Sequence, residues 1–125
     1  MSENDNHVTC GDREILIENF AAELTNAAYP LALRYGIGCS WIKMELGLWR
    51  GLVETVKKWA PQRPPAALTD EFETWREGLL ADLTESALYV AAKCGIQGPL
   101  LQVELRLYRA FRLAIRRRLT KPRYA

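Results

Sequence analysis

Histidine is almost missing from this 125-residue chain: His7 is the single example, and it stands in a polar, acidic opening segment. Its scarcity excludes Ser-His-Asp catalysis and the histidine-based metal motifs. Glycines occur singly or in Gly-x-Gly turns, so the Gly-rich loops that cradle phosphates are also missing. The chain is therefore predicted not to be an enzyme and to need no cofactor or metal.

Cysteines are few and widely spaced. Cys10, Cys39 and Cys94 form an odd set without a Cys-x-x-Cys pair, which argues against a disulfide framework or a zinc site and fits a reducing cytosol. No run approaches the roughly 18–20 uncharged apolar residues that cross a bilayer, and the polar start predicts no secretory signal. We expect a cytoplasmic protein without a membrane partner.

The composition, 49% hydrophobic and 26% charged, is typical of one folded domain. We predict a single helical-bundle domain over 1–125. Its parts are a disordered head (1–11), a first hairpin (12–59), a Pro-rich connector (60–69), a second hairpin (70–119) and a short basic tail (120–125).

The chain resembles itself at an offset of 59 residues. Residues 23–59 align without gaps to 82–118, and ten positions are identical. These are Leu24, Thr25, Ala28, Ala32, Gly36, Ile37, Glu45, Leu46, Leu48 and Arg50, which recur as Leu83, Thr84, Ala87, Ala91, Gly95, Ile96, Glu104, Leu105, Leu107 and Arg109. A repeat of this length dictates the architecture.

Each copy has the pattern of a helix, a glycine-containing turn and a second helix. Apolar residues recur at 3–4 spacing on both sides of Gly36 and of Gly95. Ser40 is placed to cap the second helix, Asp70 and Glu73 are placed to cap the third, and Pro30 should kink or break the first. We predict an all-α four-helix bundle made of two tandemly duplicated hairpins with pseudo-two-fold symmetry.

Two glutamates fall inside the predicted apolar stripes. Glu45 and Glu104 are equivalent in the repeat, and a cation precedes each by 11 residues: Arg34 and Lys93. Because a buried carboxylate needs a partner, the first interpretation is a structural ion pair in each hairpin. The alternative is a metal-binding cluster with one acid from each helix, formed by Glu23, Glu45, Asp82 and Glu104.

Tryptophans at 41, 49, 59 and 75 allow two interpretations. They could stack on nucleic-acid bases. However, Trp41, Trp49 and Trp59 share the inward arc of one predicted helix, so we expect core packing instead.

Positive charge is concentrated at the end of the chain. Residues 104–125 carry a net charge of +7, whereas the other residues sum to −5. The candidate binding residues are Arg106, Arg109, Arg112, Arg116, Arg117, Arg118, Lys121 and Arg123. Such an arginine-rich helix suits RNA or DNA phosphates or an acidic protein surface, although a charge run is often only a solvated face.

A second apolar line, Ile15, Ala22, Tyr29 and Leu33, lies opposite the core stripe of the first helix. It predicts a homo-oligomer or a subunit of a larger complex. The function expected is thus a non-enzymatic adaptor or accessory subunit that binds nucleic-acid backbone through its last helix. The alternative is a protein-directed scaffold or assembly subunit without nucleic-acid contact.

Overall fold

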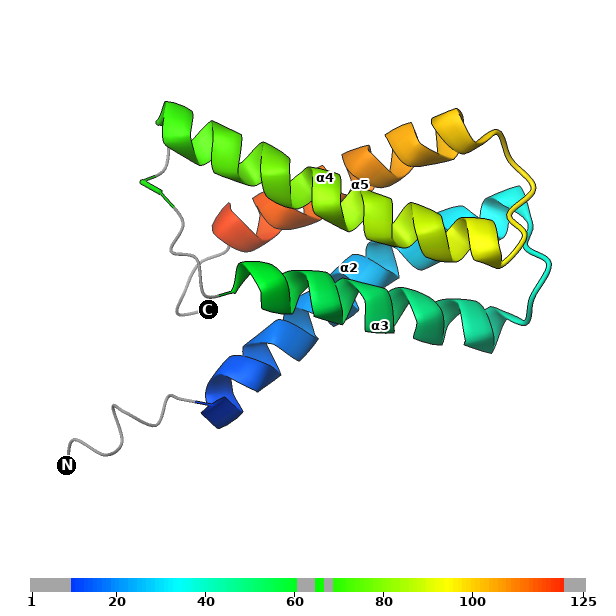
Figure 1. Ribbon diagram of the computed structural model, residues 1–125, viewed down its shortest axis with the longest axis horizontal. Coiled ribbons are helices and arrows are strands. Elements are labelled where there is room, and N and C mark those ends of the chain that lie inside the picture. Colours follow the sequence, from blue (N-terminus) through cyan, green and yellow to red (C-terminus); the bar gives the residue numbers. More distant parts are fainter. Residues whose placement is uncertain (1–9, 61–64, 67–68, 121–125) are drawn as a thin grey trace.

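The computed structural model describes residues 10–60, 65–66 and 69–120 (Figure 1). These residues form four helices and no strand: α2 (Cys10–Tyr35), α3 (Trp41–Trp59), α4 (Asp70–Lys93) and α5 (Leu100–Thr120). The predicted all-α class is confirmed. Most of the predicted head, the prolines at 61 and 64, Lys121 and Arg123 lie outside the described residues.

The helices pack as an antiparallel four-helix bundle. α2 contacts α3 and α5, and α4 contacts the same two helices. Figure 1 shows that the α2–α3 turn and the α4–α5 turn lie at the same end of the bundle. The end of α3 and the start of α4 lie at the opposite end. The two turns, which are far apart in the sequence, therefore meet at one end of the bundle.

The core follows the apolar periodicity of the sequence. Each helix presents one stripe inward, and the largest fully buried side chains include Phe111, Leu24, Met44 and Leu83. Positions 59 residues apart are buried in pairs: Leu24 and Leu83, Ala28 and Ala87, Ala32 and Ala91, Met44 and Val103, Leu48 and Leu107, Leu52 and Phe111, Val56 and Ile115. Similar packing positions in both hairpins thus follow from similar apolar patterns.

Glycine in the left-handed region ends both first helices of the hairpins. Gly36 has φ +86° and Gly95 has φ +73°, a conformation that other residues adopt only at a cost. The two turns also bind each other. The Gly38 N–H donates to the Cys94 carbonyl at 2.7 Å, and the Gln97 N–H donates to the Gly36 carbonyl at 2.9 Å.

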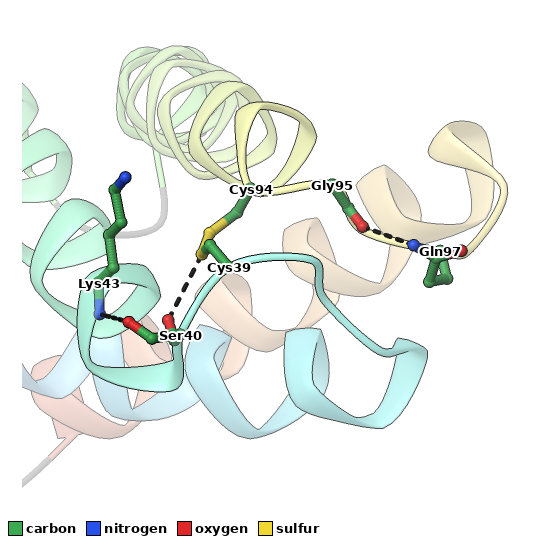
Figure 2. Close-up of a disulfide and its surroundings, with 6 residues drawn as sticks. All are labelled: Cys39, Ser40, Lys43, Cys94, Gly95 and Gln97. Carbon is green, nitrogen blue, oxygen red and sulfur yellow. Dashed lines mark hydrogen bonds between the residues drawn. A yellow bond between two sulfur atoms is a disulfide. The ribbon is translucent and has the colours of Figure 1, made fainter.

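A disulfide joins the two turns, contrary to the sequence-based expectation. Cys39 and Cys94 are bonded, with their Cα atoms 5.3 Å apart (Figure 2). The odd number of cysteines, their wide spacing and the lack of a Cys-x-x-Cys pair argued against a disulfide. The packing of the two hairpins places both turns at one end of the bundle and brings the two cysteines together. A cytoplasmic location remains a prediction, and it loses the support that free thiols would have given it.

The sequence also predicts the caps of α3 and α4 and the effect of the proline within α2. Ser40 caps α3 as expected, because its side chain accepts the Lys43 N–H. α4 is capped by Thr69 rather than by Asp70, since Thr69 has the extended backbone that a cap needs and accepts the Phe72 N–H. Pro30 does not end α2, which continues to Tyr35.

None of the helices in the described part of the chain combines the length and the apolar character that a membrane span requires.

Candidate nucleic-acid interface on the last helix

The outer side of α5 carries five of the six candidate binding residues that the structure describes. Five arginines there are exposed: Arg106, Arg109, Arg112, Arg116 and Arg117. The side of α5 that faces the bundle is formed by Val103, Leu107, Phe111 and Ile115. Because helical positions three and four apart share a face, the arginines form a continuous basic surface. We call these five residues the arginine face.

Arg118 does not belong to this surface. Its guanidinium pairs with the Glu23 carboxylate at 2.7 Å and lies 4.9 Å from the centre of the Phe20 ring. Both partners are on α2, so Arg118 fastens the end of α5 to α2. Its predicted role in partner binding stays a prediction, beside this contact within the fold.

The five arginines of the arginine face are exposed, and some of them also make contacts within the chain. Arg106 lies over the Tyr35 ring at 5.9 Å, which orients its side chain without burying it. Arg116 and Arg117 also make interactions within the chain. The arginine face is thus partly held in place by its neighbours while it stays accessible.

Tyr108 marks the edge of the arginine face that adjoins α4. Its hydroxyl donates to the Glu77 carboxylate at 2.6 Å. This hydrogen bond, followed by partial burial and the negative charge of Glu77, raises the pKa of Tyr108, while Arg112 and Arg76 oppose the shift. The sequence did not predict this contact, because it joins two residues that lie on different helices and 31 positions apart.

The two predicted ion pairs are not formed. Arg34, Lys93 and Glu104 are exposed, and Glu45 is half-buried. The buried positions next to the glutamates are Met44 and Leu48 on α3 and Val103 and Leu107 on α5, whereas neither glutamate is buried, so both carboxylates keep contact with water. Lys93 lies over the Tyr89 ring instead, and Glu45 contributes to raising the pKa of Tyr29, after the larger effect of desolvation.

The four carboxylates of the metal alternative do not converge. Glu23 is paired with Arg118, and Asp82 accepts a hydrogen bond from the Trp59 indole N–H at 2.8 Å. In residues 10–60, 65–66 and 69–120 no group of three or more potential metal-ligating side chains lies close enough together to hold an ion. Asp82 instead ties α3 to α4, with Lys58 at 3.7 Å.

The tryptophans divide between core and surface. Trp49, Trp59 and Trp75 are partly buried against the core, and the Trp59 and Trp75 rings meet edge to face at 6.2 Å. Trp41 is 57% exposed, so its predicted core position is wrong. It is the first residue of α3.

One feature that the sequence did not reveal as a site is a groove of about 300 Å³ between α2 and α3. Its α2 wall is Ala22, Thr25 and Asn26, and its α3 wall is Ile42, Glu45, Leu46 and Trp49. Ile42 and Leu46 are 58% and 44% exposed. Of the second apolar line predicted on the first helix, Ala22 lines this groove and Tyr29 is half-buried, while Ile15 and Leu33 remain exposed.

The comparisons with known proteins identify no relative: the chain matches no protein-family model, no curated protein and no solved structure.

Proposed function

We propose that this protein is a non-enzymatic helical adaptor whose arginine face binds the phosphate backbone of RNA or DNA. The observation that carries the proposal is that five exposed arginines lie along one side of one helix. Six arginines and one glutamate are the charged residues of α5, so the helix has a strong positive field. The positive surface attracts a polyanion.

The dimensions of the arginine face suit a nucleic-acid strand. Arg106 and Arg117 are separated by 11 positions, which is about 16 Å along a helix axis. This length spans about five phosphates of one strand at roughly 3.4 Å each. The guanidinium groups can donate two hydrogen bonds to one phosphate, whereas an ammonium group acts as a single point charge.

The test is binding to an unrelated RNA and an unrelated DNA over a range of salt concentrations. The triple variant Arg109→Glu, Arg112→Glu, Arg116→Glu should lose binding. For the wild-type chain, the logarithm of the binding constant should fall with the logarithm of salt by about 0.7–0.9 per phosphate contacted.

A matched control comes from the other helices. Arg34 on α2 and Lys43 and Lys57 on α3 are also exposed, so changing all three to Glu alters the net charge by the same amount away from α5. This control should keep most of the binding. Equal losses in the two triple variants would mean that only the total charge matters and would refute a site on α5.

One observation favours a protein partner as the second candidate. Leu105 and Leu113 are 48% and 46% exposed among the arginines. Leucine side chains make no favourable contact with phosphates. An acidic protein surface that also carries apolar residues would contact both the arginines and the leucines. A partner that co-purifies after nuclease treatment, together with a chain that binds neither RNA nor DNA, would favour this scaffold function.

We also infer that the bundle arose by tandem duplication of one helical hairpin and has approximate two-fold symmetry. The support is the paired burial of residues 59 positions apart and the left-handed glycine at the same place in both hairpins. An experimental structure in which residues 23–59 and 82–118 fail to superpose would overturn this inference.

A further inference from the structure

The two hairpins carry matching apolar residues on their outer surfaces as well as in the core. Six of the seven residues that line the α2–α3 groove recur 59 positions later with identical or similar chemistry, while the seventh, Asn26, becomes Glu85. Alanine, threonine, glutamate and leucine are retained at Ala81, Thr84, Glu104 and Leu105, while Ile42 becomes Leu101 and Trp49 becomes Tyr108. Core packing requires the buried positions to be apolar, but it does not require exposed ones to match.

Several of these residues are strongly exposed in both hairpins. Ile42 and Leu101 are 58% and 79% exposed, and Leu46 and Leu105 are 44% and 48% exposed. Exposed apolar residues that cluster at one place are typical of contact surfaces. We define face one by Ile42, Glu45, Leu46 and Arg50, and face two by Leu101, Glu104, Leu105 and Arg109.

Other positions on the same two helices have diverged. Lys43 and Glu54 on α3 correspond to Gln102 and Leu113 on α5, and all four are exposed. Thus the hairpins differ at outer positions next to these faces and yet keep the faces alike. Binding to a partner explains why the two faces stay alike, because exposure to solvent alone would let them diverge like the positions beside them.

The charges on each face complement a second copy of the same face. In both, a glutamate and an arginine five residues apart flank the exposed leucine: Glu45 and Arg50 around Leu46, Glu104 and Arg109 around Leu105. At about 1.5 Å per residue the two charges are separated by roughly 7.5 Å along the helix axis. Positions five apart lie about 140° around the helix, on opposite sides of the apolar centre, so when two such faces meet in parallel orientation the glutamate of one lies beside the arginine of the other.

We propose that face one and face two are self-association surfaces, each of which binds the equivalent surface of another copy of this chain. The leucines and isoleucine supply the apolar centre of the contact, and the Glu–Arg pairs set its orientation. Because every chain has two faces, association can extend beyond a dimer. Arg109 belongs both to face two and to the arginine face, but the apolar centre of the contact requires no nucleic acid, so association should persist in nuclease-treated protein.

Sedimentation velocity and light scattering across a concentration series test the proposal. The wild-type chain should form assemblies larger than a dimer. Leu46→Glu or Leu105→Glu alone should limit assembly to a dimer, since one face remains, and the double variant should be a monomer. If each single variant is a monomer and a mixture of the two gives a dimer, face one binds only face two, and the binding of each face to its own equivalent would be overturned.

Leu113→Glu is the matched control. Leu113 is 46% exposed on α5 but lies outside both faces, so this variant should assemble like the wild type. Circular dichroism should show that all these surface variants keep the helical fold. A wild-type chain that stays monomeric at high concentration, or a double variant that associates like the wild type, would overturn the proposal.

Discussion

Cys39 and Cys94 link the two turns of the bundle across 55 residues of sequence. Cys39 lies just before α3, and Cys94 caps the end of α4. The bond therefore connects the two hairpins through their turns (Figure 2), at the end where backbone hydrogen bonds already join them. It fastens the hairpins at the end opposite the chain connection between them.

The first prediction concerns the stability that this bond provides. Closing a loop of this length should stabilise the fold by about 2–4 kcal/mol, mainly by restricting the unfolded chain. Cys39→Ser, or a reductant, should lower the free energy of unfolding by that amount in urea titrations. Cys10→Ser is the control and should have little effect. If the denatured, unreduced protein shows three free thiols instead of one, the bond does not form in solution.

The second prediction concerns glycine at two kinds of position. Gly95→Ala places a side chain at φ +73°, so it should destabilise the fold by about 1 kcal/mol or more. Gly51 lies inside α3, and a Cβ there would be an ordinary 3.6 Å from Val90. Gly51→Ala should therefore stabilise the fold by up to about 1 kcal/mol. Thermal unfolding should show a lower melting temperature for Gly95→Ala and a higher one for Gly51→Ala. An unchanged melting temperature in Gly95→Ala would contradict the strained turn.

Local features of the fold could be predicted from the sequence, whereas contacts between distant segments could not. Helix stripes and the turn glycines could be predicted because the 3.6-residue period and left-handed caps are local properties. The disulfide could not, since neither cysteine has a counterpart in the repeat and only the packed turns bring them together. On α5 the helical pattern placed most arginines on the surface, but the contact of Arg118 with Glu23 needed the position of α2.

The third prediction follows from the ion pair that is not formed. Arg34→Met and Glu45→Gln should have additive effects on the free energy of unfolding, with a coupling below about 0.5 kcal/mol. Arg118→Met with Glu23→Gln is the matched cycle, because those side chains meet at 2.7 Å. Its coupling should be about 0.5–1 kcal/mol, reduced by partial exposure to water. A larger coupling in the first cycle than in the second would reverse this assignment.

The last prediction concerns alkaline pH and the Tyr108–Glu77 hydrogen bond. The fold raises the pKa of Tyr108, first through this bond and then through partial burial, so the folded chain holds the proton more tightly than the unfolded chain does. This contribution is complete below the unfolded tyrosine pKa, about 10, and is lost as pH rises through the higher folded pKa.

Urea titrations from about pH 8 to about pH 11 should therefore show the wild-type chain losing stability more steeply than Tyr108→Phe does above pH 10. Tyr89→Phe is the control, since Tyr89 is 63% exposed on the surface of α4. That variant should keep the steep wild-type dependence. If Tyr108→Phe and the wild-type chain lose stability in parallel throughout this range, then the hydroxyl does not hold its proton against Glu77, and α4 and α5 are joined there by apolar packing alone.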